Sequence, residues 1–285
     1  QLNLEDSTLL RNSAIQGGGI FTQSSSVFPN STVDIVKSSI LSNFARDGGG
    51  VYSDGALINS SLIDNNKAAD DGGGVFSSGD ISIVDSTISN NYASGSGGGI
   101  NAKDMGATID IHRSSIFSNF SSENGGGLVC GYYSDCTIYN TTISSNIASK
   151  GGGIASYTYY GEFSVTNSTI IGNSVFNEGG GIYTAYSAIL NRNIISGNQN
   201  RDAQDEIVAN FGDMIITNMN IIGLNGSAGI KGFTLTVSDI IPSAPLNAII
   251  GPLADNGGPT WTHALPPGSP AIDRAPNNAC TAAPV

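Results

Sequence analysis

The sequence predicts an all-β solenoid, a parallel β-helix of about nine coils with roughly 27 residues in each coil. Three observations predict this fold. A glycine triplet followed by an aliphatic residue recurs at intervals of 24 to 31 residues, beginning at positions 17, 48, 72, 97, 125, 151 and 179. A Ser/Thr-rich block that ends in Asn, such as SSILSN, precedes each triplet. These segments lack the apolar period of 3.6 residues that an amphipathic helix requires.

Short runs of alternating residues predict the strands of each coil. Residues 81–84 (ISIV) and 108–111 (TIDI) are examples of such runs,. Three short strands and three turns use about 27 residues, which is one coil of a parallel β-helix. The Ile or Leu of each Ser/Thr-rich block is then expected to point inward and to stack on its counterparts in a buried aliphatic column.

The asparagine at the end of each block predicts a ladder along one corner of the solenoid. Asparagine tolerates the left-handed backbone of a sharp corner, and stacked amides can hydrogen-bond from coil to coil. The predicted ladder consists of Asn12, Asn43, Asn65, Asn91, Asn119, Asn146, Asn173 and Asn198, with Asn225 as its continuation.

The glycine triplets predict a second corner. Glycine adopts positive φ at no steric cost, and it lets neighbouring coils approach more closely than a Cβ would permit. We therefore expect the triplets to be scaffold. A phosphate cradle is excluded, because no triplet leads into Gly-Lys-Ser or Gly-Lys-Thr,.

Composition and charge narrow the function classes. The chain of 285 residues has a formal net charge of −12 with 11 Lys and Arg, and only 12% of its residues are charged. So few cations argue against nucleic acid as a partner and against docking on anionic lipid. No apolar run approaches the roughly 18–20 residues of a membrane span, so we expect no membrane insertion.

The chain has three cysteines, whose pairing depends on whether the protein is in an oxidising or a reducing compartment,. Cys130 and Cys136 enclose five residues and form a candidate disulfide, with two free thiols as the alternative. Cys280 would then be left unpaired within the chain.

The repeat resembles a known family. The alternation of GGGI or GGGV with a Ser/Thr-Ile-x-x-Asn block is similar to the parallel β-helix repeats of the pectin-lyase-like superfamily. It is most similar to the GGA(I/L/V) and FxxN repeats of polymorphic outer-membrane proteins, and residues 117–119 (FSN) lie close to the second pattern. The resemblance covers roughly residues 1–230 and implies a right-handed solenoid, without specifying an activity.

The C-terminal sequence carries a second resemblance. Residues 251–265 (GPLADNGGPTWTHAL) and 268–273 (GSPAID) resemble the tail of bacterial surface β-helix proteins called choice-of-anchor Q. That resemblance implies secretion and display at a cell surface.

The prolines divide the chain into two parts. Nine of the ten prolines lie at or after Pro242, and proline is unsuited to a central strand. We therefore expect a repeat array over 1–239 and a Pro-rich tail over 240–285 that caps or wraps the last coils. Trp261 and His263 are expected to pack this tail onto the last coil.

The first residues align with the middle of a coil, because 2–12 match 81–91 without a gap. The array is therefore expected to start mid-coil, with bare strand edges that pair readily with another chain. Two interpretations follow. Either the chain is a piece of a longer array, or the open end stacks on a second copy in a head-to-tail filament.

The polar residues do not predict a catalytic site. Asp85 and Asp110 do not share an offset within their coils, as a carboxylate pair for glycoside hydrolysis one coil apart would. His112 and Arg113 are expected to be surface structure rather than a base and an electrophile. The acids before the triplets are expected to form turns, with weak Ca²⁺ ligation as the alternative and no other cofactor; they are Asp47, Asp70, Asp71, Glu123 and Glu178.

Tyrosines gather in three successive coils, soon after the glycine triplet of each. Stacking of the coils should bring them into one patch, a candidate contact for a glycan or for a neighbouring subunit. Packing under loops or on the tail is the alternative. The tyrosines are Tyr132, Tyr133, Tyr157, Tyr159, Tyr160, Tyr183 and Tyr186, and Tyr139 lies in the first of these coils.

Six Asn-x-Ser/Thr sequons occur in the chain. If the source is eukaryotic, the candidate N-glycosylation sites are Asn30, Asn59, Asn140 and Asn167. The other two, Asn119 and Asn225, belong to the predicted ladder.

These observations favour a non-enzymatic, secreted or surface-displayed protein with a structural or adhesive role, as a subunit of a filament or stalk. A surface adhesin that binds polysaccharide is the first alternative, and a polysaccharide lyase or glycosidase is the second.

Overall fold

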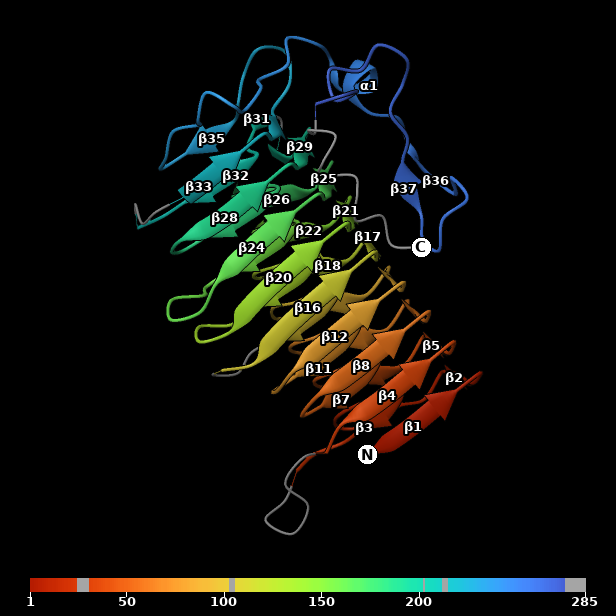
Figure 1. Ribbon diagram of the computed structural model, residues 1–285. Coiled ribbons are helices and arrows are strands. Elements are labelled where there is room, and N and C mark those ends of the chain that lie inside the picture. The colour runs from red at the N-terminus through yellow and green to blue at the C-terminus, as the bar shows by residue number, and fades with distance from the viewer. Residues whose placement is uncertain (25–30, 103–105, 202, 212–214, 275–285) are drawn as a thin grey trace.

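The computed structural model describes residues 1–24, 31–102, 106–201, 203–211 and 215–274. The chain winds into a parallel β-solenoid whose coils stack along one axis (Figure 1). Each full coil contributes one strand to each of four sheets. Three of these sheets have nine strands and the fourth has eight, which corresponds to about eight complete turns. The predicted fold class is confirmed.

The strands of sheet A have four or five residues each, and sheet B follows sheet A in each coil. Sheet A consists of β1 (Leu2–Glu5), β4 (Val33–Val36), β8 (Ala56–Asn59), β12 (Ile81–Val84), β16 (Thr108–His112), β20 (Asp135–Tyr139), β24 (Phe163–Thr166), β28 (Ala188–Asn191) and β33 (Ile215–Asn218). Sheet B consists of β2 (Thr8–Leu10), β5 (Ser39–Leu41), β9 (Leu62–Asp64), β13 (Thr87–Ser89), β17 (Ser115–Phe117), β21 (Thr142–Ser144), β25 (Thr169–Ile171), β29 (Ile194–Ser196) and β34 (Ile221–Ile222).

Sheets C and D complete each coil, before and after the glycine triplet. Sheet C consists of β6 (Phe44–Ala45), β10 (Lys67–Ala68), β14 (Tyr92–Ala93), β18 (Phe120–Ser121), β22 (Ile147–Lys150), β26 (Ser174–Glu178), β30 (Gln199–Asn200) and β31 (Ala203–Gln204), of which the last pair is antiparallel. Sheet D consists of β3 (Ile20–Phe21), β7 (Val51–Ser53), β11 (Val75–Ser77), β15 (Ile100–Ala102), β19 (Leu128–Cys130), β23 (Ile154–Ser156), β27 (Ile182–Thr184), β32 (Ile207–Ala209) and β35 (Ile230–Lys231).

The expected three strands per coil were one too few. The additional strand is that of sheet C, which follows the ladder asparagine and in several coils has only two residues, as in β6 and β10. A strand of two residues is too short to display the alternation by which strands are recognised in a sequence.

The core contains the predicted aliphatic column. The central residue of each sheet B strand points inward and is paired in register with its counterpart in the next coil. From the second coil onward the column is fully buried, and it consists of Ile40, Ile63, Ile88, Ile116, Ile143, Ile170, Ile195 and Ile222. Burial of each such side chain contributes roughly 1.5–3 kcal/mol, which makes these columns the main source of stability.

Both roles predicted for the glycine triplets are present, but in different glycines. The first glycine of every triplet has a φ between +59° and +72°. The second lies against the neighbouring coil: a Cβ on Gly98 would lie 2.4 Å from the Phe120 carbonyl oxygen and 2.5 Å from that of Gly126. Such distances are well inside van der Waals contact, so the triplets allow the coils to stack at this corner.

The asparagine ladder is continuous over eight coils. The backbone N–H and Nδ2 of each asparagine both donate to Oδ1 of the asparagine in the next coil, at 2.9–3.1 Å. Its members are Asn12, Asn43, Asn66, Asn91, Asn119, Asn146, Asn173 and Asn198.

Two assignments to this ladder were wrong. Asn65 is the exposed corner residue, with φ +56°, and its neighbour Asn66 occupies the ladder. Asn225 does not continue the ladder, because its backbone N–H donates to the carbonyl of Ala244 in the C-terminal segment.

Glu206 ends the asparagine ladder. Its Oε2 accepts from the backbone N–H of Asn198 at 3.0 Å and from Asn198 Nδ2 at 2.6 Å, and its Oε1 accepts from the Gly197 N–H at 2.8 Å. Burial raises the pKa of Glu206 to about 7. The hydrogen bonds act in the opposite direction, because they favour the charged form, but burial has the larger effect,. Its side chain lacks the amide N–H₂ of asparagine, and its backbone N–H donates to the Gly229 carbonyl at 2.7 Å, so the ladder stops here,.

A second ladder, which the sequence reading missed, follows the corner between sheets A and B. In each coil a backbone N–H donates to the side-chain oxygen of the equivalent residue in the next coil, at 2.9–3.4 Å. It also ends on a carboxylate. In order, its members are Ser7, Ser38, Ser61, Ser86, Ser114, Thr141, Ser168, Asn193, Asn220 and Asp239.

The C-terminal segment covers the last coil and then runs back along sheet B (Figure 1, blue). It contains the short helix α1 (Leu246–Ile249) and the hairpin of β36 (Leu253–Ala254) and β37 (Thr262–His263). Ile249 and Ile250 are buried against Ile171 and Ile221 of the solenoid. In the part of the chain that the structure describes, no helix has the length and apolar character needed to cross a bilayer.

Trp261 and His263 attach this segment to the middle of the solenoid rather than to the last coil. The Trp261 ring stacks on Phe117 of β17, with 5.9 Å between the ring centres. His263 contacts β21, with 3.0 Å between its Nε2 and the hydroxyl oxygen of Ser144, and its Nδ1 lies 2.7 Å from the carbonyl oxygen of Gly251. The segment therefore covers the last coil and also spans several of the coils before it.

We predict that acidification loosens this attachment. Burial lowers the pKa of His263 below its ordinary value of 6.5,. The unfolded segment therefore takes up the proton first, so the stability contributed by neutral His263 is complete above about pH 6.5 and falls as the pH drops below it. Hydrogen exchange of residues 251–265, corrected for its intrinsic pH dependence, should be faster at about pH 5 than at about pH 7.5. His263→Gln should remove this difference, and equal protection of the wild type at both pH values would contradict the prediction.

Candidate functional site

Six aromatic side chains form one contiguous patch, which we call the tyrosine cluster. They lie in the loops that follow sheet D and lead into sheet A, before β20, β24, β28 and β33 (Figure 1). Parallel stacking brings the loops of successive coils together, as in the backbone hydrogen bond from Tyr159 N–H to the Tyr132 carbonyl at 2.8 Å. The cluster consists of Tyr132, Tyr133, Tyr159, Tyr160, Tyr186 and Phe211.

The rings of the cluster pack mainly against one another. Tyr159 and Tyr160 meet edge to face, with 4.4 Å between their centres. Three pairs are stacked, so that each of these rings has a face covered by its neighbour: Tyr133 on Tyr160 at 5.0 Å, Tyr132 on Tyr159 at 5.4 Å, and Tyr186 on Phe211 at 5.4 Å.

The cluster is exposed although it is aromatic. Tyr160 is 69% exposed and Phe211 is 64% exposed, and Tyr132, Tyr133 and Tyr159 are also exposed. Monomeric proteins seldom leave contiguous apolar patches uncovered, so such a patch points to an interaction surface.

Two of the predicted tyrosines lie apart from this surface. Tyr183 is buried on sheet D, where Lys150 Nζ lies 5.0 Å from the centre of its ring. Tyr157 packs beside it, and burial raises the pKa of Tyr157 to about 12. Tyr139 pairs with His112 on sheet A, with 6.0 Å between the ring centres. Phe211 was not among the predicted residues, because that prediction grouped residues by type and Phe211 shares only the loop position of the tyrosines.

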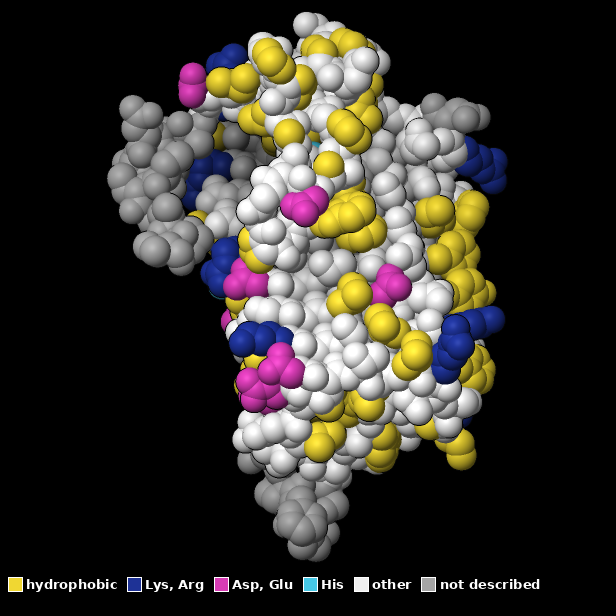
Figure 2. Space-filling view, turned by 90° about the vertical axis from the view of Figure 1, so that its right-hand side faces the viewer, with side chains coloured by type: hydrophobic (Ala, Val, Ile, Leu, Met, Phe, Trp, Pro, Cys, Tyr) yellow, Lys and Arg dark blue, Asp and Glu magenta, His cyan; other side chains and the backbone are white. Residues whose placement is uncertain are grey.

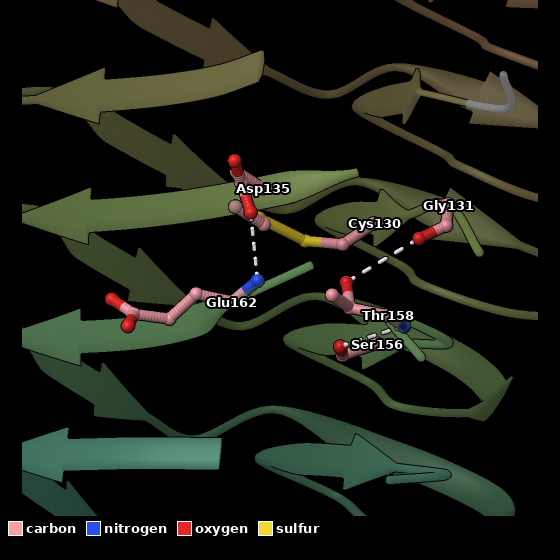
Figure 3. The surroundings of a disulfide bond; sticks show 7 residues. Cys130, Gly131, Asp135, Ser156, Thr158 and Glu162 are labelled. Atoms are coloured by element: carbon pink, nitrogen blue, oxygen red, sulfur yellow. Dashed lines mark hydrogen bonds between the residues drawn. A yellow bond between two sulfur atoms is a disulfide. The ribbon is translucent and has the colours of Figure 1, made fainter. Parts of the chain in front are cut away.

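A disulfide closes the loop that carries Tyr132 and Tyr133. It joins Cys130 at the end of β19 to Cys136 in β20, and both cysteines are buried in the solenoid core (Figure 3). The next loop is tied to this one by the hydrogen bond from Thr158 Oγ1 to the Gly131 carbonyl, at 3.3 Å. Cys280 lies outside the described residues.

The residues considered for catalysis are engaged in structural contacts. Arg113 Nε and Nη2 each lie 2.8 Å from a carboxylate oxygen of Asp85, in a bidentate pair between adjacent coils. Asp110 is aligned across sheet A with Ser82 and Thr137 rather than with a second carboxylate.

The corner acids bind donors on neighbouring coils. Glu178 forms an ion pair with Lys150 at 2.8 Å, and Asp70 lies 3.5 Å from Arg46. Among the described residues, no three His, Cys, Asp or Glu side chains lie together as a metal site would require. The remaining acids are also hydrogen-bonded between coils: Asp71 N–H to Asp47 at 3.4 Å, Ser96 N–H to Asp71 at 2.8 Å, and Ser96 Oγ to Glu123 at 3.2 Å.

The sequons fall in different environments. Asn59 is exposed at the end of β8, whereas Asn140 and Asn167 are half-buried corner residues with positive φ, and Asn167 accepts a hydrogen bond from Arg192 at 2.8 Å. Asn119 is buried in the ladder. Asn30 lies outside the described residues.

Comparison with known protein families finds a match for one stretch of the chain. Residues 85–103 match the Chlamydia polymorphic membrane protein repeat. The matched stretch contains β13, the ladder residue Asn91, the triplet 97–99 and β15, which together make up most of one coil. No curated protein and no solved structure matches the chain. The protein is therefore a β-solenoid repeat protein with similarity to that repeat.

Proposed function

We propose that the protein is a non-enzymatic structural and adhesive component of an extracellular surface, and that its tyrosine cluster joins copies of the chain side by side. The similarity to a membrane-protein repeat and the resemblance of the tail to that of surface β-helix proteins support the location. The disulfide supports it too, because disulfides persist mainly in oxidising compartments,.

One observation supports the assignment of this contact surface. A cluster of six aromatic rings, most of them exposed, lies on otherwise polar loops. Tyrosine supplies large contact area at little cost in side-chain entropy, and it is enriched in protein interfaces. Because the rings already stack on one another, they present edges and hydroxyls, which suit an opposing protein surface better than a sugar ring.

Side-by-side contact is better supported than the head-to-tail stacking expected from the sequence. Continuation past the last coil would require free backbone N–H groups at the ends of both ladders, and those of Glu206 and Asp239 already donate to the carbonyls of Gly229 and Thr236,. The helix α1 and the chain around it also cover this coil.

A non-enzymatic role is supported by the contacts of the candidate catalytic groups. Asp85 and Arg113 neutralise each other in a bidentate pair, which leaves neither poised as a general base or electrophile,.

Sedimentation velocity over a range of concentrations tests the contact surface. The wild type should form dimers whose dissociation constant falls as salt is added, because salt screens the repulsion between two chains of net charge −12,. The triple variant Tyr159→Ser/Tyr160→Ser/Phe211→Ser should weaken this association at least about tenfold, or about 1.4 kcal/mol.

The matched control removes exposed aromatic side chains elsewhere. Phe44→Ser/Phe176→Ser replaces residues that are 43% and 58% exposed, and it should leave association unchanged. A wild type that remains monomeric at high concentration, or equal loss in both variants, would contradict the proposal.

A further inference from the structure

A groove lined by both polar and apolar side chains lies on the outer face of sheet B, on the side of the molecule that Figure 2 shows. Its volume is about 510 Å³, within the range of ligand sites in proteins,. Strands β5, β9 and β13 form its floor, and residues 259–261 of the C-terminal segment close one end. Charged side chains are few on this face, most of which is backbone and uncharged side chains (white in Figure 2).

The floor presents hydroxyls and a carboxylate in register. Leu62 pairs with Ser39 on one side and with Thr87 on the other, so their outward side chains follow one another along the groove. In the parallel row, Asp64 Oδ1 accepts from Ser89 Oγ and from Asn90 Nδ2, both at 2.7 Å. Both of these hydrogen bonds use Oδ1, so Oδ2 is left to accept from a ligand.

Trp261 forms the end wall and is held rigidly. One face of its indole stacks on Phe117, with 5.9 Å between the ring centres and 8° between the planes. Its backbone carbonyl accepts from Ser115 Oγ at 2.9 Å, and the neighbouring Thr260 hydroxyl donates to the Arg113 carbonyl at 3.3 Å. The side chain is nevertheless 50% exposed, so an aromatic surface remains open beside the polar floor.

Charge favours an uncharged ligand. Lys37 and Asp64 place one charge of each sign in the groove, and Asp85 is paired with Arg113 at 2.8 Å. The net charge of −12 on the whole chain opposes anionic ligands further,.

We propose that this groove binds a neutral oligosaccharide. Sugar rings combine a face of C–H groups, which suits the open indole surface, with a rim of hydroxyls, which suits the Thr87 and Ser39 hydroxyls and the Asp64 carboxylate. The site is separate from the tyrosine cluster, which lies on the loops before sheet A, and it does not depend on self-association.

Trp261 is the single tryptophan of the chain, so its fluorescence reports on this site directly. We would titrate the full chain with cellotriose, maltotriose and mannotriose, with trigalacturonate as the acidic comparison. At least one neutral trisaccharide should give a saturable change in tryptophan emission. A response to none of the three, or to trigalacturonate alone, would overturn the proposal.

Variants that keep the reporter then locate the site. Thr87→Val and Asp64→Asn each remove one polar contact and should weaken binding about tenfold. Tyr160→Ser in the tyrosine cluster should leave binding unchanged. Trp261→Phe, followed by calorimetry, should retain it within a few-fold because an aromatic face remains. Loss of binding in Tyr160→Ser, or unchanged binding in both groove variants, would overturn the assignment.

Discussion

Replacement of Gly98 by alanine is expected to lower the free energy of unfolding by about 4 kcal/mol or more. The added Cβ would lie 2.4 Å from the Phe120 carbonyl oxygen and 2.5 Å from that of Gly126. Both are backbone atoms of the next coil, so neither can move away without separating the two stacked coils,. Chemical denaturation followed by far-ultraviolet circular dichroism measures the loss.

Gly258→Ala is the matched control. Gly258 lies in the exposed turn before β37, and the nearest atom to its added Cβ would be the Thr260 carbonyl oxygen at 3.7 Å. This substitution should change stability by no more than about 0.5 kcal/mol. If both variants were equally stable, the close approach of coils would not be the reason for glycine at the second triplet position.

Asn66→Ala is expected to cost about 3 kcal/mol. Its buried amide accepts from the Asn43 backbone N–H at 2.9 Å and donates to the Ile40 carbonyl at 2.8 Å and to Asn91 Oδ1 at 3.1 Å. Alanine would remove these hydrogen bonds from the Asn43 N–H and the Ile40 carbonyl, whereas Asn91 Oδ1 would keep the bond from the backbone N–H of residue 66. Buried polar groups that lose their partners carry the cost of desolvation.

The adjacent Asn65 supplies the control for the ladder. Asn65→Gly preserves the positive φ of the corner and removes only an exposed side chain that donates to Ser42 Oγ at 3.0 Å. It should alter the unfolding free energy by less than about 1 kcal/mol. A larger cost at Asn65 than at Asn66 would show that the ladder runs through the other residue.

The fold was predictable because the same three structural features recur together seven times along the sequence. The inward isoleucine, the ladder asparagine and the glycine triplet each have one structural reason, and each recurs at nearly constant spacing. The error at Asn65 arose where two asparagines are adjacent. Counting three residues from the inward isoleucine, as from Ile40 to Asn43 or from Ile88 to Asn91, would have selected Asn66 after Ile63.

The ends of the ladders could not be predicted in the same way. Glu206 reaches Asn198 because the hairpin of β30 and β31, which departs from the repeat, turns the chain back just before it. Asp239 lies in the segment that follows the last full coil. Neither residue stands at the spacing that marks a ladder position. Only the three-dimensional path of the chain brings these carboxylates to the last donors.

The surface sites depended on the path of the C-terminal segment and on the loops. The aromatic residues of the cluster share a position in the loops before sheet A, and not a residue type. Phe211 therefore stacks with tyrosines, although the prediction from sequence considered tyrosines alone. The groove at Trp261 exists because residues 251–263 run back along sheet B as far as β17. Contacts between segments more than a hundred residues apart do not follow the repeat, so they could not be predicted from its spacing.

Photo-oxidative cross-linking of tyrosines in a mixture of isotopically light and heavy protein tests the proposed side-by-side contact most directly. At concentrations where dimers form, mass spectrometry should find mixed-isotope cross-links between the peptide containing Tyr159 and Tyr160 in one copy and the tyrosine cluster of another. Mixed-isotope links confined to other tyrosines, such as Tyr52 or Tyr92, would contradict the assignment of this surface. Links formed only within one copy would contradict self-association itself.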